Sequence, residues 1–222
     1  MKYKNILFDL DGTLTDPKVG ITKGVQYALT CFGIEEPDLD KLTPFIGPPL
    51  VNSFKEFYAM SDDEAWEARE AYREYYGETG IYENELYEGI APLLCSLKEK
   101  GYCLVVASSK PRLYVKRILS YFRIMRYFDI VEGSEMDGKH TDKAQLIAHI
   151  LEKWNLKADE CVMIGDRKYD IEGAKANGMD SIAVGYGYGS EDELSGAEPT
   201  HFFSTIEELK NFFLNRYPQS EF

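Results

Sequence analysis

Two aspartates, Asp9 and Asp11, follow a short apolar run at residues 6–8 and precede Gly12 and Thr13. In an extended chain, side chains at i and i+2 lie on one face, so these two carboxylates can converge on one point. Carboxylates held close together repel each other unless a cation joins them. The pair therefore predicts an acidic site for a hard cation such as Mg²⁺, with a solvated acidic turn as the alternative.

Other polar side chains follow two further apolar runs. Ser108, Ser109 and Lys110 come directly after residues 104–107, and Asp166, followed by Asp170, comes after residues 161–164. Ligands of open α/β sheets bind at the carboxyl ends of the strands. We therefore expect these groups to gather with Asp9 and Asp11 at one edge of a sheet.

Lys143 is expected to point into the same crevice. It precedes Ile147 by four residues, which places it on the sheet-facing side of a helix predicted over residues 142–154. A lysine at a helix N-terminus opposes the helix dipole, so an acidic site or a bound phosphate must hold it there. A surface lysine whose stem lies along the helix is the alternative, and Lys139 is the nearest competitor for the role.

The elements that must position these groups follow from hydrophobic periodicity. Strand-length apolar runs that do not alternate with polar residues are typical of parallel strands covered on both faces. Helical spacing lies between them, with Pro111 suited to a first helical position and Gly178 to a helix end. The pattern predicts a doubly wound, Rossmann-like parallel sheet. The predicted strands are at residues 6–8, 104–107, 130–131, 161–164 and 182–184.

Residues 17–85 interrupt this alternation and are predicted to be helical throughout. Ser61 and Glu64 form a capping-box signature for the last helix, whose apolar stripe includes Tyr72, Tyr75 and Tyr76. We expect a small helical cap at 17–85 inserted into a catalytic core of residues 1–16 and 86–222. The tyrosines are expected in the core of the cap, with stacking on a nucleobase as the alternative. The predicted helices are at 18–33, 39–45, 49–58 and 62–77.

Composition limits the possible partners and location. The 222 residues are 44% hydrophobic and carry a formal charge of −13, which argues against a nucleic-acid polymer or an anionic membrane surface as a partner. The four cysteines lack metal-finger spacing and are expected to be buried, reduced thiols. Only a short apolar run follows Lys2 and Lys4, so no signal peptide is expected. We expect a cytoplasmic monomer or weak homodimer.

The segment from Asp9 to Thr13 resembles the first motif of the haloacid dehalogenase-like superfamily, most of whose members are phosphatases. Ser108, Lys143, and Asp166 with Asp170 then match the second, third and fourth motifs, with Ser where Thr is frequent in the second. Four further strings resemble the phosphoglycolate-phosphatase-like group, particularly its bacterial 5′-nucleotidase-like branch. These strings lie at residues 14–17, 44–49, 165–170 and 184–189.

The resemblance implies a phosphatase in which Asp9 is the nucleophile and Asp11 the general acid and base. It implies Mg²⁺ binding by Asp9, Asp11, Asp166 and Asp170, where Asp11 offers its backbone carbonyl and Asp170 orients either Lys143 or a metal-bound water. Contacts to a small phosphorylated substrate fall to Ser108, Ser109, Lys110, Lys143 and Gly47, the last in a loop at 44–50 that can also be an ordinary turn.

The substrate that the resemblance favours is a nucleoside 5′-monophosphate. Phosphoglycolate is the first alternative. A sugar phosphomutase, a haloacid dehalogenase and a non-enzymatic regulatory protein stay open as other functions of the same motifs. Arg167 and Lys168, beside the acidic site, either contact substrate or balance charge.

Overall fold

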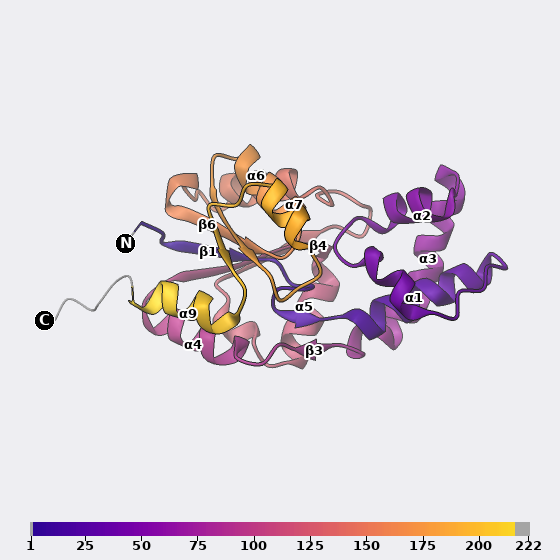
Figure 1. Cartoon of the computed structure of the whole chain (residues 1–222), viewed down its shortest axis with the longest axis horizontal. Helices are drawn as coiled ribbons and strands as arrows, with labels where there is room; N and C mark the ends of the chain where they lie inside the picture. The colour runs from indigo at the N-terminus through magenta and orange to yellow at the C-terminus, as the bar shows by residue number, and fades with distance from the viewer. Residues whose placement is uncertain (1, 216–222) are drawn as a thin grey trace, which may run out of the picture. The chain divides into compact units, whose positions relative to one another are not determined.

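The structure, a computed structural model, describes residues 2–215 and divides into two compact units (Figure 1). The core unit comprises Met1–Leu14 and Leu86–Phe222, and the helical unit comprises Thr15–Glu85. Residues 216–222, which the expected core includes, lie outside the described residues. No helix within residues 2–215 is long and apolar enough to cross a membrane.

Six strands of the described core unit form one sheet in the order β5-β4-β1-β6-β7-β8, and every pairing is parallel (Figure 1). The innermost strands are almost wholly buried, as continuous apolar runs predict. The strands are β1 (Asn5–Phe8), β4 (Cys103–Pro111), β5 (Ile130–Ser134), β6 (Cys161–Gly165), β7 (Asp180–Val184) and β8 (His201–Phe203).

Strand β1 lies at the point where the strand order reverses. The chain continues from β4 to β5 on one side of β1, and from β6 through β7 to β8 on the other. Phe8, the last residue of β1, pairs with Val106 of β4 and Ile164 of β6. The residues that follow these three therefore lie side by side at the carboxyl edge of β1, at the position where doubly wound folds bind ligands.

Helices cover both faces of the sheet. α6 (Lys143–Lys153) and α7 (Lys168–Ala176) lie on one face, and α4 (Ile90–Glu99), α5 (Arg112–Tyr121) and α9 (Ile206–Asn215) lie on the other (Figure 1). Leu146, Ile147 and Ile150 of α6 are fully buried against strand residues such as Leu7. The predicted doubly wound parallel sheet is confirmed.

Two local predictions need correction, and one strand was missed. Strand β8 was not predicted because it lies at the edge of the sheet, where none of its three residues is buried, so it lacks the apolar run of a strand covered on both faces. Pro111 is the N-cap of α5 rather than its first residue, since β4 continues up to it. Cys31 is exposed at the end of its helix; all four cysteines are free, and Cys161 alone is buried.

The helical unit contains α1 (Lys18–Cys31), η1 (Leu39–Phe45), α2 (Leu50–Tyr58), α3 (Asp62–Glu78) and η2 (Gly80–Tyr82), with the short strands β2 (Thr15–Asp16) and β3 (Glu85–Leu86) at its ends. The capping box of Ser61 and Glu64 is present at the start of α3. Tyr72 and Tyr76 are buried and stacked at a centroid distance of 5.0 Å, and a Cβ on Gly24 of α1 would meet the Tyr72 ring at 2.8 Å. These two tyrosines therefore belong to the core of the helical unit.

Candidate active site

The turn after β1 carries the first two acidic groups. Asp9 donates its backbone N–H to Ile164 O at 2.9 Å, so the parallel ladder extends one residue beyond the strand and fixes this position. Both Asp9 and Asp11 are buried. Gly12 has a φ of 80°, and a Cβ there would lie 2.1 Å from Asp166 Oδ2. Glycine is thus required by both the backbone conformation and the close approach of the fourth motif.

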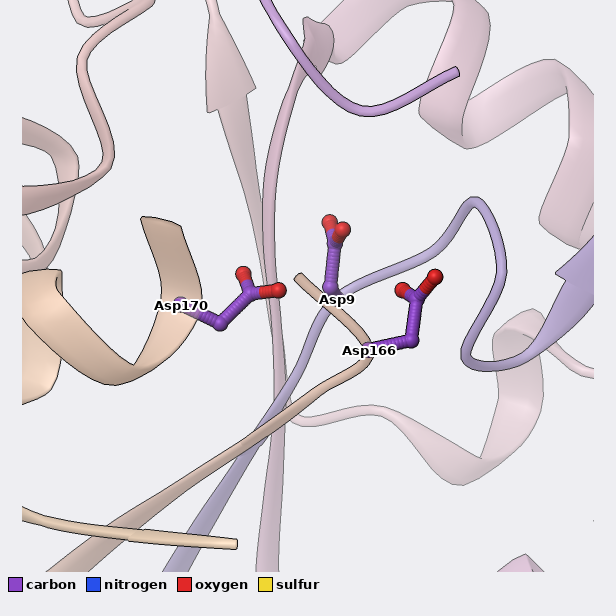
Figure 2. A group of neighbouring side chains, drawn as sticks. All are labelled: Asp9, Asp166 and Asp170. Carbon is purple, nitrogen blue, oxygen red and sulfur yellow. The ribbon is translucent and has the colours of Figure 1, made fainter. Parts of the chain in front are cut away.

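Asp9, Asp166 and Asp170 converge from three segments: the turn after β1, the loop after β6 and the first turn of α7 (Figure 2). One oxygen from each carboxylate lies within 4.8 Å of the others, and all three residues are buried. Asp9 is far from Asp166 and Asp170 in the sequence, and the pairing of β1 with β6 brings the three residues together. We call these three residues the acidic cluster.

Lys143 lies beside the acidic cluster as the first residue of α6. Its ammonium Nζ is 3.0 Å from Asp9 Oδ1 and 2.8 Å from Asp170 Oδ1, and it donates a hydrogen bond of 2.8 Å to Ala107 O at β4. Burial lowers the pKa of Lys143, but the charges of Asp170 and Asp9 outweigh burial and raise it, so the side chain is cationic. Lys139, the sequence-based competitor, is exposed and pairs with Asp137.

Asp166 is held by neutral donors. Its Oδ1 accepts a hydrogen bond of 3.0 Å from the Thr13 hydroxyl, and its Oδ2 accepts one of 2.8 Å from Tyr188 N–H. Burial, followed by the charges of Asp170 and Asp9, raises its pKa well above the ordinary value. The ionised form of Asp166 is therefore disfavoured unless a cation joins the cluster.

Asp170 caps the helix that carries it. Its Oδ2 accepts a hydrogen bond of 3.2 Å from Arg167 N–H, at the N-terminus of α7 where a carboxylate also faces the positive end of the helix dipole. Burial raises the pKa of Asp170 to about 6, an effect that Lys143 opposes. Asp170 is thus joined to Lys143 and to the loop that follows Asp166.

Asp11 points to a different partner. Both of its carboxylate oxygens face Lys110 Nζ, at 2.9 Å and 2.7 Å, and the two side chains are nearly buried. Burial raises the pKa of Asp11, and the charge of Lys110 opposes this shift. Of the four predicted metal ligands, three thus form the acidic cluster, while the side chain of Asp11 engages Lys110.

The remaining predicted substrate contacts are divided between the two units. Ser108 is buried near the end of β4, where its hydroxyl accepts a hydrogen bond of 3.3 Å from Lys110 N–H, and Ser109 is half-buried beside it. Gly47 has a φ of 108° and belongs to the helical unit. Its contact with substrate stays a prediction.

The acidic cluster has the chemistry of a site for a hard divalent cation. Three buried carboxylates lie together and one lysine pairs with two of them, Asp9 and Asp170, which leaves excess negative charge in a place that water reaches poorly. Asp9 Oδ1 and Asp170 Oδ1 face this lysine, yet no described residue gives either atom a well-directed hydrogen bond. An all-oxygen donor set of this kind suits Mg²⁺ better than softer metals.

One functional segment was not assigned a role from the sequence. The glycine-rich loop at residues 185–189 lacks the spacing of a nucleotide-binding fingerprint, but it packs against Asp166. A Cβ on Gly187 would lie 2.3 Å from Asp166 Cβ and 2.4 Å from Gly12 O. The alternation of glycine with tyrosine was the available signal, because glycines at every second position allow a close approach of two backbones.

Comparison with known proteins agrees with this geometry. A family model described as haloacid dehalogenase-like hydrolase matches residues 6–184, which include β1 from Ile6 onward, every later strand up to β7 and the whole acidic cluster. The chain belongs to this family. The predicted superfamily membership is confirmed.

Several relatives of the chain are named as phosphatases. A 5′-nucleotidase of Pseudomonas aeruginosa is 49% identical over 95% of each chain, and a phosphoglycolate phosphatase of Vibrio parahaemolyticus is 28% identical over 93% of this chain and 94% of its own. A crystal structure of a predicted phosphatase from Clostridium acetobutylicum has a TM-score of 0.94 at 45% identity and covers 97% of this chain and all of its own. The prediction of a phosphatase is confirmed at this level.

A relative named for another activity is similar to most of this chain. The tyrosine-protein kinase PtkA of Mycobacterium tuberculosis is 39% identical over 92% of this chain and 70% of its own length. Hydrolysis and phosphoryl transfer to an acceptor thus both occur among proteins similar to this chain, so its specific reaction must be argued from the site.

Proposed function

We propose that the protein is a Mg²⁺-dependent phosphomonoester hydrolase that acts through an aspartyl-phosphate on a nucleoside 5′-monophosphate. The observation that supports this most directly is the convergence of Asp9, Asp166 and Asp170 with Lys143 at the strand-order reversal. The carboxylate of Asp9 can act as the nucleophile, and the ammonium group of Lys143 beside it supplies positive charge for a phosphoryl group.

In the proposed reaction a carboxylate oxygen of Asp9 attacks phosphorus, the bond from phosphorus to the ester oxygen breaks, and Asp9 carries the phosphoryl group. Asp11 gives a proton to the departing oxygen and later takes one from the water that hydrolyses the aspartyl-phosphate. Ser108 and Lys143 bind phosphoryl oxygens. Mg²⁺ held by the acidic cluster would neutralise the charge that the carboxylates and the phosphoryl group bring together.

The choice of substrate rests on similarity. The 5′-nucleotidase of P. aeruginosa is 49% identical to this chain, against 28% for the phosphoglycolate phosphatase of V. parahaemolyticus. The sequence strings at residues 14–17 and 44–49 favour the same branch. Phosphoglycolate is the alternative. With four free cysteines and a charge of −13, we propose a cytoplasmic enzyme that acts on small molecules and not on nucleic-acid polymers, as a monomer or weak homodimer.

The test is a comparison of kcat/KM for nucleoside 5′-monophosphates and phosphoglycolate at one Mg²⁺ concentration. A preference for nucleotides supports the proposal, and a preference for phosphoglycolate overturns the substrate while leaving a phosphatase. Chelation should stop hydrolysis and added Mg²⁺ should restore it; full activity in excess chelator would exclude the metal-dependent reaction. A parallel assay with ATP and a tyrosine peptide tests the activity that the name of PtkA describes.

A further inference from the structure

Helix α8 (Glu191–Gly196) and the loop before it hold the segment that carries Asp166 and Asp170. Tyr188 N–H donates to the Asp166 carboxylate at 2.8 Å, and Gly189 N–H donates to the Asp166 backbone carbonyl at 3.0 Å. Tyr186 reaches further and donates its hydroxyl to Thr13 O at 3.1 Å. The loop is therefore fixed to Asp166 at two points and to Thr13 at a third before α8 begins.

Glu193 of α8 makes a second set of contacts to this segment. Its Oε1 accepts from Arg167 Nε at 2.8 Å and from Lys168 N–H at 2.9 Å, and its Oε2 accepts from a terminal nitrogen of Arg167 at 3.3 Å. The side chains of Arg167 and Glu193 are 13% and 20% exposed. A two-point pair of this kind fixes direction as well as distance, and solvent screens it less than an exposed pair.

Arg167 lies between the two metal-site carboxylates in the chain. Its backbone N–H donates to Asp170 Oδ2 at 3.2 Å, while its guanidinium is held by Glu193. Lys168, whose N–H Glu193 also accepts, is the first residue of α7, the helix that carries Asp170. Glu193 thus holds the residue after Asp166 and the start of the helix that orients Asp170.

These contacts also answer the question that the sequence left open for Arg167. The guanidinium engages Glu193 within the core unit, so the charge-balance interpretation is favoured over substrate contact. Lys168 contributes through its backbone N–H. The partner that matters, Glu193, lies 26 residues further along the chain.

We propose that Glu193 is a positioning residue for the metal site: through Arg167 and Lys168 it sets the distance and orientation of Asp166 and Asp170. This inference rests on the proposed Mg²⁺-dependent function. Glu193 is not a catalytic residue in this scheme, because it contacts the loop and not the acidic cluster itself. Residues that orient metal ligands commonly change metal affinity about 10- to 100-fold when replaced.

The test measures Mg²⁺ affinity directly, by calorimetric titration of the full-length protein without substrate. We expect Glu193→Gln and Glu193→Ala to raise the Mg²⁺ dissociation constant about 10- to 100-fold while circular dichroism shows a folded protein. Glu198→Gln is the matched control. Glu198 lies just after α8 and pairs at 2.6 Å with Lys175 of the same helix α7, but both side chains are well exposed.

A merely structural role predicts another pattern. A brace between α8 and α7 would lower the melting temperature of the Glu193 variants and leave the Mg²⁺ dissociation constant at the wild-type value, which would overturn the inference. Arg167→Gln provides an independent arm if the Glu193 variants do not fold, since it removes the guanidinium and leaves Glu193 free to accept Lys168 N–H. We expect it to weaken Mg²⁺ binding too, and unchanged binding would also overturn the inference.

Combining the two changes tests whether the pair acts as a unit. Arg167→Gln with Glu193→Gln should weaken Mg²⁺ binding little more than either change alone, and independent, multiplying effects would contradict coupling through this pair. The wild-type titration separates two kinds of failure. Wild-type protein that binds no Mg²⁺ and hydrolyses no phosphomonoester overturns the proposed function and this inference together; wild-type binding that the variants match overturns the inference alone.

Discussion

Lys110 and Asp11 form a nearly buried ion pair in which Nζ of Lys110 lies 2.9 Å and 2.7 Å from the two carboxylate oxygens of Asp11. Lys110 comes from the end of β4 and Asp11 from the turn after β1, so the pairing of these two strands brings them together. The substrate contact expected for Lys110 stays a prediction. Its ion pair with Asp11 leads us to expect that Lys110 orients the group proposed as general acid and base.

Replacement of Lys110 by methionine should therefore lower kcat more than it raises KM. We expect kcat to fall about 10²-fold, which is the lower end of the range that a general acid contributes. The loss should be larger for a nucleoside 5′-monophosphate, whose leaving alkoxide needs a proton, than for p-nitrophenyl phosphate, whose leaving group does not. Lys116→Met on the exposed side of α5 is the control. A rise in KM with unchanged kcat would instead identify Lys110 as a substrate contact.

Asp9→Asn should abolish turnover and leave the fold intact. The amide keeps the size of the side chain and the backbone hydrogen bond to Ile164, but it cannot attack phosphorus. Steady-state assays with p-nitrophenyl phosphate at saturating Mg²⁺ measure the loss, with circular dichroism as the check on folding. Residual activity above about 1% would mean a loss smaller than the about 10²-fold minimum expected for such a group. Asp9 would then not be the nucleophile.

Lys143→Met should destabilise the metal-free protein. The change leaves Asp9 and Asp170 buried without their cation and leaves Ala107 O without its donor. Breaking a buried pair from one side costs about 3–5 kcal/mol. Urea unfolding in chelator measures the free energy of unfolding, and Lys139→Met, at an exposed lysine in the preceding loop, should change it little. Equal stability of the two variants would show that Lys143 does not neutralise the cluster.

Much of this site could be predicted because Asp9 and Asp166 each directly follow a strand. Once residues 6–8 and 161–164 are recognised as parallel strands, the carboxyl-edge rule places Asp9 and Asp166 together without knowledge of side-chain contacts. The same rule, with helix spacing, places Lys143 near them. Strand β8 was missed because it is a partly exposed edge strand, and it has no continuous apolar run like those of the strands covered on both faces.

Pairings that depend on side-chain reach could not be predicted. The sequence position of Lys110 does not show whether its ammonium group contacts substrate or pairs with Asp11, because substrate and Asp11 would lie at the same edge of the sheet. Glu193 has no motif that relates it to Arg167, since the contact depends on how the glycine-rich loop turns back over Asp166. Strand order determines which groups share an edge, whereas loop conformation determines which atoms meet.

Asp166→Asn should stabilise the metal-free protein at neutral pH. Burial and the neighbouring carboxylates raise the pKa of Asp166 in the folded state, so the folded protein binds its proton more tightly than the unfolded chain does. The stability that Asp166 contributes is fully present at pH values below its pKa in the unfolded chain. It is lost as pH rises through the higher pKa that Asp166 has in the folded protein. Asparagine avoids that loss, and its amide can donate to the Thr13 hydroxyl while its carbonyl accepts Tyr188 N–H.

Melting temperatures of Asp166→Asn and wild type in chelator, from about pH 4 to about pH 8, measure this effect. The advantage of the variant should grow as pH rises, and saturating Mg²⁺ should reverse it by stabilising only the wild type. A wild type that is the more stable protein in chelator at the highest pH would contradict a destabilising charge at Asp166.

Gly187→Ala should destabilise the protein and weaken Mg²⁺ binding, because there is no space for a methyl group. The added Cβ would lie 2.3 Å from Asp166 Cβ and 2.4 Å from Gly12 O, so either the loop or the carboxylate must move. Overpacking of this kind costs about 1–3 kcal/mol.

Gly196→Ala at the end of α8 is the opposite case, since nothing lies within 4 Å of its Cβ position. There alanine should be neutral or stabilise by up to about 1 kcal/mol through the unfolded chain. Urea unfolding and Mg²⁺ titration of both variants measure the contrast, and Mg²⁺ affinity that survives unchanged in Gly187→Ala would show that the loop does not hold Asp166 in its binding position.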